Sequence, residues 1–268
     1  MTLAGNSMQD LPADGAIFIV GLSRSGTKLL RDILNQHSRI RLPDRESYFI
    51  PHVLKHFAEQ GSTPDTPSRA NFIRYLRSSA FYRNMERQGA PLPADRLASL
   101  VESGETWPAI IESVFRFYTG PADTPYLWGD KTPKYLNHML LLAEHFAGAR
   151  FLHIYRDPRD RVLSANKAWG ANIYISAQQW SAAMQRAHAQ ARDLATAYKT
   201  VRYEDLITSP STVIGELCAF LAVDYEPQML ELEFPVERRG DMEHPTRKNT
   251  GIYAGNIHKY RRDMTPQQ

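Results

Sequence analysis

The stretch AIFIVGLSRSGTKLLRDILNQ, residues 16–36, decides the fold of this chain. It begins with an unbroken apolar run, residues 17–20, which is typical of a strand buried on both faces. A short polar turn lies between Gly21 and Gly26 and contains Arg24. After this turn, apolar residues recur at the spacing of a helix. The stretch therefore predicts a strand, a tight loop and a helix.

A loop of this kind binds an anion, most often a phosphate, because it points backbone N–H groups and the positive end of a helix dipole at one spot. A nucleoside-triphosphatase loop has the order G-x-x-x-x-G-K-[ST]. Here the two glycines have that spacing, but Thr27 and Lys28 follow in reversed order and the main cation, Arg24, lies inside the loop. The sequence therefore predicts a different phosphate loop. An ordinary strand, turn and helix with a chance arginine is the alternative.

The composition is that of an ordinary globular protein. The 268 residues are 43% hydrophobic and 23% charged, enough for one large α/β domain or two small ones. A net charge of +3, dispersed along the chain, suits anionic ligands but gives no reason to expect nucleic acid as a partner. The single cysteine, Cys218, allows no internal disulfide, and no Cys/His spacing suggests a metal site.

The first residues of the chain, 1–15, lack the basic segment and apolar stretch of a secretory signal. No run approaches the roughly 18 apolar residues of a membrane span. We therefore expect a cytoplasmic protein that does not contact membranes.

A second phosphate-binding segment is predicted near residue 156. The apolar run of residues 151–155 predicts another buried strand, and Pro158 favours the start of a helix that carries Ser164. Arg156 at the end of this strand can hold a phosphate bidentately, and the serine hydroxyl can reach the same group. The alternatives are a charged helix start, or Asp157 as the magnesium-binding acid of a kinase.

Two further charged residues are candidates for catalysis. Glu46 follows residues 37–43, a turn and a short extended segment that we expect beside the first strand and hence near the loop. Lys131 precedes Thr132 and Pro133, and Thr132 can cap a helix that begins at Pro133, so the lysine is held at a helix mouth. A solvated surface carboxylate and a surface lysine are the alternatives.

Together these segments resemble the sulfotransferases that use 3′-phosphoadenosine-5′-phosphosulfate (PAPS), in particular the bacterial, tyrosylprotein and heparan branch. Arg24-Ser25-Gly26-Thr27 resembles the 5′-phosphosulfate loop of that family, and Arg156 with Ser164 resembles its 3′-phosphate motif. The segment from Glu46 to Phe49 resembles the one that carries the family's catalytic glutamate, although Asp44 is a competing alignment. Gly129 to Pro133 resembles its Glu/Asp-Lys-Thr-Pro segment.

The resemblance implies a P-loop-like three-layer α/β fold with a central parallel sheet of about four or five strands. A single sulfotransferase domain would span residues 16–262, between a flexible N-terminus (1–15) and a tail (263–268). Residues 51–125 read as a helical insertion on the acceptor side.

The resemblance also implies transfer of a sulfuryl group from PAPS to a hydroxyl, with 3′-phosphoadenosine-5′-phosphate (PAP) as product and without a metal. Glu46 would be the general base, with Lys131 and Arg24 as the other catalytic residues; His52, His56 and His153 are lesser candidates for the base. The implied nucleotide-binding residues are Arg24, Ser25, Gly26, Thr27, Lys28, Arg156, Ser164, Tyr203, Arg247 and Lys248.

Two other functions stay open at this point. An ATP-dependent small-molecule kinase is disfavoured by the missing Gly-Lys-Ser/Thr order and by the absence of a clear magnesium carboxylate. An inactive nucleotide-binding relative is disfavoured by the intact set of candidate residues. A small molecule or a carbohydrate is expected as acceptor rather than a protein tyrosine, because no secretory signal is recognised. The sequence predicts neither the acceptor's identity nor the oligomeric state.

Overall fold

The structure is a computed structural model that describes residues 15–58, 61, 63–232, 252, 255 and 257–265. Within these residues, a five-stranded parallel sheet has the order β2-β3-β1-β4-β5. The strands are β1 (Ala16–Gly21), β2 (Ile40–Arg41), β3 (Leu127–Lys131), β4 (Arg150–Tyr155) and β5 (Tyr198–Arg202). The predicted α/β fold with a central parallel sheet of four or five strands is therefore confirmed. The N-terminus predicted to be flexible lies, up to residue 14, outside the described residues.

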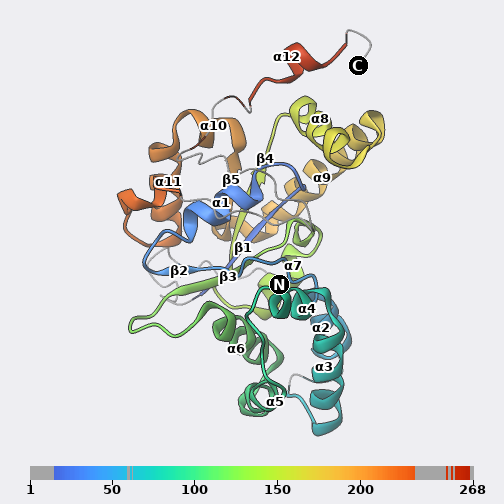
Figure 1. The fold of residues 1–268 in the computed structure, drawn as a ribbon, viewed down its shortest axis with the longest axis vertical. Coiled ribbons are helices and arrows are strands. Elements are labelled where there is room, and N and C mark those ends of the chain that lie inside the picture. Colours follow the sequence, from blue (N-terminus) through green and yellow to red (C-terminus); the bar gives the residue numbers. More distant parts are fainter. Residues whose placement is uncertain are drawn as a thin grey trace.

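Strand β1 lies at the centre of the sheet, between β3 and β4, which explains its unbroken apolar run. Phe18 and Val20 face one hydrophobic core, and Ile17 and Ile19 face the other. A helical layer covers each face of the sheet (Figure 1). The layer beside Ile17 consists of α1 (Thr27–Leu34), α10 (Tyr203–Thr208) and α11 (Pro210–Leu221).

The layer beside Phe18 is larger because it includes the helices between β2 and β3. These are α2 (Ile50–His56), α3 (Thr66–Ser78), α4 (Ala80–Arg87), α5 (Ala94–Ser103) and α6 (Trp107–Thr119). They gather at one end of the molecule (Figure 1), where aromatic rings such as those of Phe49, Phe81 and Phe115 pack 5.6–6.0 Å apart. The loop that carries Glu46 leads directly into α2, so this end of the molecule borders the site.

The remaining elements complete the frame around the sheet. They are η2 (Pro133–Asn137), α7 (Met139–His145), α8 (Pro158–Trp169), α9 (Ile173–Leu194), η3 (Ala195–Ala197), η4 (Pro227–Leu230) and α12 (Tyr260–Asp263). Helix α12 contacts α8, near the top of the view in Figure 1. No helix in the described part of the chain is both long and apolar enough to cross a membrane.

Candidate active site

The candidate residues follow the carboxyl ends of the sheet strands. Arg24 lies in the loop between β1 and α1, Lys131 is the last residue of β3, and Arg156 and Tyr203 come directly after β4 and β5. Because the parallel strands all end at one edge of the sheet, the loops that follow them bring these side chains to that edge.

The loop after β1 is folded tightly by two residues with left-handed backbone angles, Arg24 (φ 74°) and Gly26 (φ 96°). Glycine is required at position 26 for a second reason: a Cβ atom there would lie 2.4 Å from Cδ2 of Tyr203. The Oγ atom of Ser25 is buried and has no hydrogen-bond partner among the described residues. The first N–H groups of α1 have no acceptor within the helix. Such a loop fits an anionic group that supplies acceptor oxygens.

The two predicted phosphate-binding segments meet at this loop. The Nε atom of Arg24 donates a hydrogen bond of 3.1 Å to Oγ of Ser164 on α8. Nη1 of Arg156 lies 3.4 Å from the carbonyl oxygen of Arg24, and the Arg156 guanidinium lies 4.5 Å from the centre of the Tyr203 ring. The structure thus brings Arg24, Arg156, Ser164 and Tyr203 together. The Tyr203 ring is buried beneath the loop, against Gly26.

Arg156 is only 7% exposed and is contacted from several sides. The indole N–H of Trp180 on α9 donates to its carbonyl oxygen over 3.0 Å. The buried carboxylate of Asp160 lies 3.8 Å from its Nη2 atom and also accepts the backbone N–H of Tyr260, which attaches α12 to this site. The arginine is therefore oriented before any ligand binds.

Asp157, the residue that could be a kinase-like acid, is already engaged. Its side chain accepts the backbone N–H of Arg159 and caps α8. It also forms an ion pair of 2.7 Å with the Arg159 guanidinium, and this hydrogen bonding lowers the pKa of the Asp157 carboxyl. Asp157 thus serves the start of α8, which disfavours a magnesium-binding role.

Glu46 and Lys131 form an ion pair at the end of β3. The ammonium group donates to Oε1 of the glutamate over 2.5 Å, and the phenol of Tyr48 donates to Oε2. Lys131 is only 6% exposed, whereas the side chain of Glu46 is 26% exposed. The predicted base and the predicted lysine are therefore neighbours, and the carboxylate faces the more open side.

A buried polar network lies beneath this pair. Oδ2 of Asp130 accepts hydrogen bonds from the hydroxyls of Ser47 (2.5 Å) and Thr132 (2.9 Å), and Oγ of Ser47 lies 2.6 Å from the phenol oxygen of Tyr135. Asp130 is completely buried, which raises the pKa of its carboxyl to about 7. The network connects the loop of Glu46 to the strand end that carries Lys131.

The predicted helix cap at Thr132 is wrong. The element that starts at Pro133 is a 3₁₀ helix, and its N-cap residue makes no side-chain capping bond. The Thr132 hydroxyl instead donates to Asp130 and accepts the N–H of Ser47 (3.0 Å). A buried carboxylate needs donors more than a helix end does, because an unsatisfied buried charge is costly.

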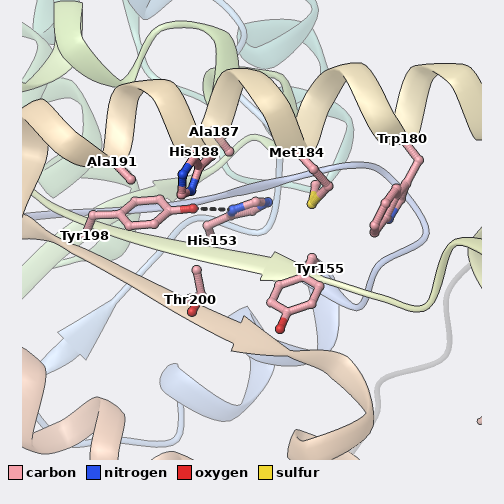
Figure 2. A pocket seen from close by; sticks show the side chains of 9 residues that line it. All are labelled: His153, Tyr155, Trp180, Met184, Ala187, His188, Ala191, Tyr198 and Thr200. Carbon is pink, nitrogen blue, oxygen red and sulfur yellow. Dashed lines mark hydrogen bonds between the residues drawn. The ribbon is translucent and has the colours of Figure 1, made fainter.

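His153 lies in the middle of β4, away from the carboxyl edge of the sheet, and its Nδ1 atom is 2.5 Å from the phenol oxygen of Tyr198 (Figure 2). Burial lowers its pKa to about 4. It lines a pocket of about 310 Å³ between α9 and strands β4 and β5. This placement disfavours His153 as the base. The pocket residues are His153, Tyr155, Trp180, Met184, Ala187, His188, Ala191, Tyr198 and Thr200.

The other lesser candidates, His52 and His56, lie on α2 with their rings 4.2 Å apart, and the His52 ring stacks on Tyr75 at 4.4 Å. Burial and the neighbouring His56 lower the pKa of His52. Arg247 and Lys248, the predicted nucleotide contacts of the C-terminal segment, lie outside the described residues.

The sequence interpretation missed several residues that shape the site: Ser47, Tyr48, Asp130, Asp160 and Trp180. Ser47 and Asp130 contact each other across 83 residues of the chain, and Trp180 contacts Arg156 across 24. Tyr48 and Asp160 contact the nearby Glu46 and Arg156, two and four residues away. Asp130 was the easiest to find, since a carboxylate inside a buried strand end calls for a partner.

A parallel sheet with a tight, glycine-containing loop after its central strand, and basic side chains at its carboxyl edge, is the architecture of P-loop-like α/β proteins, a class whose loops bind anionic ligands. More narrowly, the chain belongs to the sulfotransferase family, whose sequence model matches residues 16–227.

Individual relatives agree with this family. The chain is 25% identical over 239 residues to protein-tyrosine sulfotransferase 1 of Danio rerio, covering 87% of this chain and 59% of the fish protein. It is 25% identical over 228 residues to protein-tyrosine sulfotransferase of Drosophila melanogaster, covering 81% of this chain and 40% of that protein. The chain thus spans less than two thirds of these relatives.

Two solved structures share the fold along nearly the whole chain. The sulfotransferase domain of the Synechococcus PCC 7002 olefin synthase has a TM-score of 0.65 and 23% identity, covering 96% of this chain and 91% of that chain. The sulfotransferase domain from the curacin biosynthetic pathway has a TM-score of 0.60 and 23% identity, covering 94% and 92%. At this level of identity the two structures establish the fold.

Proposed function

We propose that this chain transfers a sulfuryl group from PAPS to a hydroxyl group of an acceptor. The hydrogen bond between Arg24 and Ser164 carries the proposal, because it joins the loop after β1 to the helix after β4 beside Arg156. Two anion-binding segments that meet in this way suit a ligand with two separate anionic groups.

The residues present fit such a nucleotide. Arg24, the backbone N–H groups of residues 25–27 and the buried Oγ of Ser25 would hold the 5′-phosphosulfate, with Lys28 nearby in the chain. Arg156 and Ser164 would hold the 3′-phosphate, since a guanidinium binds phosphate bidentately. Tyr203, Arg247 and Lys248 remain candidates for further nucleotide contacts, the last two from the sequence alone.

When bound, PAPS supplies a sulfuryl group whose S–O bond to the 5′-phosphate breaks, so that PAP leaves with the electron pair. Glu46 takes the proton of the acceptor hydroxyl while the hydroxyl oxygen forms a bond to sulfur. General-base catalysis of this kind typically increases the rate about 10²–10⁴-fold. Lys131 balances the negative charge of the sulfonate oxygens. Arg24 stays protonated at all relevant pH values, so it holds the ligand and donates no proton to the leaving group.

No observation favours the kinase alternative. Asp157 is occupied by Arg159 and by the start of α8. In place of the P-loop lysine and the magnesium ion that a kinase needs, the proposal assigns the cations Arg24, Lys131 and Arg156. We therefore propose a reaction without a metal.

The acceptor is proposed by class only. A hydroxyl on a small molecule or a carbohydrate is the first expectation, and the names of the relatives make a tyrosine peptide the obvious competitor. All three classes belong in one screen with PAPS as donor, with PAP release as the common readout.

Calorimetric titration with PAP and with ADP, each with and without Mg²⁺, tests the nucleotide site. We expect PAP to bind equally well with and without Mg²⁺ and ADP to bind much more weakly. Arg156→Ala should abolish PAP binding, whereas the matched control Arg159→Ala, which removes an exposed guanidinium three residues away, should leave it nearly unchanged. Magnesium-dependent preference for ADP would reject the proposal and favour the kinase.

A further inference from the structure

The backbone on both sides of Tyr48 is fixed by the end of β3 and by η2. The N–H of Ser47 donates to Oγ1 of Thr132 over 3.0 Å, and its hydroxyl donates to Asp130. The N–H of Ile50 donates to the phenol oxygen of Tyr135 over 3.1 Å. Phe49 and Ile50 are buried in the core. The loop that carries Glu46 therefore has little freedom to move.

Within this fixed loop, Tyr48 adopts a left-handed backbone conformation, with φ at 58°. That conformation is unfavourable for a bulky residue and is normally taken by glycine or asparagine. If the loop required only the turn, glycine would serve better at this position. Strained residues of this kind gather at functional sites, where the surrounding structure maintains them.

The side chain shows what this conformation achieves. Tyr48 is 47% exposed, yet its phenol turns back toward the chain and donates to Oε2 of Glu46. Burial of its polar end and the hydrogen bond to Glu46 raise the pKa of the Tyr48 phenol, so the hydroxyl stays protonated and acts as a donor. The ammonium group of Lys134 lies 5.7 Å from the centre of the ring and steadies it from another side.

Glu46 thus has a different donor on each oxygen, Lys131 on Oε1 and Tyr48 on Oε2. In the proposed reaction Lys131 turns to the sulfonate oxygens, which leaves the carboxylate held by the tyrosine alone. A carboxylate on a flexible side chain must be held in one orientation to accept a proton efficiently.

From this geometry we infer that Tyr48 is a positioning residue for the sulfuryl transfer: it holds the Glu46 carboxylate toward the acceptor hydroxyl after Lys131 has left it. The inference rests on the proposed function, in which Glu46 is the base.

The decisive variants are Tyr48→Phe, which removes only the hydroxyl, and Tyr48→Gly, which removes the side chain and relieves the backbone. The matched control is Tyr225→Phe, which removes a hydroxyl from another exposed tyrosine near η4. Each variant is assayed with PAPS and two acceptors: benzyl alcohol, which needs a base, and 4-nitrophenol, which ionises readily without one. If neither compound is an acceptor, the release of PAP with water as the acceptor is measured instead.

We expect Tyr48→Phe to lower kcat with benzyl alcohol, or with water, about tenfold or more, with little change for 4-nitrophenol and an unchanged Kd for PAP. Tyr48→Gly should lose as much activity while its Tm does not fall. Equal rates for Tyr48→Phe, Tyr225→Phe and the unmodified chain would overturn the inference. If Glu46→Gln itself keeps full activity with every acceptor, the proposed base is wrong, which is a separate outcome.

Discussion

Gly26 is the position where a single methyl group should do the most damage to the nucleotide site. Its φ of 96° is strained for any residue with a Cβ, at a cost of about 1–2 kcal/mol. The added Cβ would also lie 2.4 Å and 2.8 Å from two ring carbons of Tyr203, a buried residue that also packs against Arg156. Overpacking of this kind costs about 1–3 kcal/mol.

We therefore expect Gly26→Ala to lower the free energy of unfolding by about 2–5 kcal/mol. Gly89→Ala is the matched control, because Gly89 has a φ of 79° but nothing in the described part of the chain lies within 4 Å of the added Cβ. It should lose only the backbone contribution, about 1–2 kcal/mol. Urea unfolding of both variants measures the difference.

Binding of PAP provides the second measurement. The added methyl group should displace the Tyr203 ring, which packs against both the loop and the Arg156 guanidinium. Gly26→Ala should therefore weaken PAP binding at least tenfold, while Gly89→Ala should not change it. Equal losses of stability in the two variants, or unchanged PAP affinity in Gly26→Ala, would refute the reasoning from the contact with Tyr203.

Three further predictions concern charges in and near the site. Glu46→Gln should leave the Kd for PAP unchanged and lower kcat at least a hundredfold, and comparable losses of PAP binding in Glu46→Gln and Arg156→Ala would contradict the separation of catalysis from binding. Burial raises the pKa of Asp130 to about 7, so the folded chain holds a proton that the unfolded chain releases; the contribution of Asp130 to stability should therefore fall as pH rises from about 4 to 7, by up to about 4 kcal/mol, and in urea unfolding Asp130→Asn should gain stability relative to the unmodified chain between pH 5 and pH 8. Burial lowers the pKa of His153 to about 4, so the contribution of His153 to stability should be lost as pH falls from about 6.5 to 4, by up to about 3 kcal/mol; His153→Gln should gain stability relative to the unmodified chain between pH 7 and pH 5, and an unchanged difference between the two would contradict this.

The parts of the fold that local spacing determines were predictable from the sequence. The run around Phe18 predicted the central strand, and the position of Ser164 relative to Arg156 predicted a hydroxyl on the following helix. In both cases a strand, a turn and a helix lie within about twenty residues, where periodicity is informative. The meeting of Arg24 and Ser164 follows from parallel strands that end at the same edge.

The support of Glu46 was not predictable in the same way. Ser47 and Asp130 are 83 residues apart in the chain, and only the pairing of strands brings them together. The capping rule at Thr132 is local, and it failed because a buried carboxylate competed for the same hydroxyl. Nothing in the residue type of Tyr48 suggests a left-handed backbone, since the usual signals for that conformation are glycine and asparagine.

The contact between Gly26 and Tyr203 also constrains how chains of this kind can diverge. A side chain at position 26 is compatible only with a smaller residue at position 203, since both occupy the same few ångströms beneath the loop. The two positions are separated by 177 residues, yet they should change as a pair, and either change alone should be purged by selection. In an alignment of descendants, this pair should covary more strongly than either residue does with its neighbours in the chain.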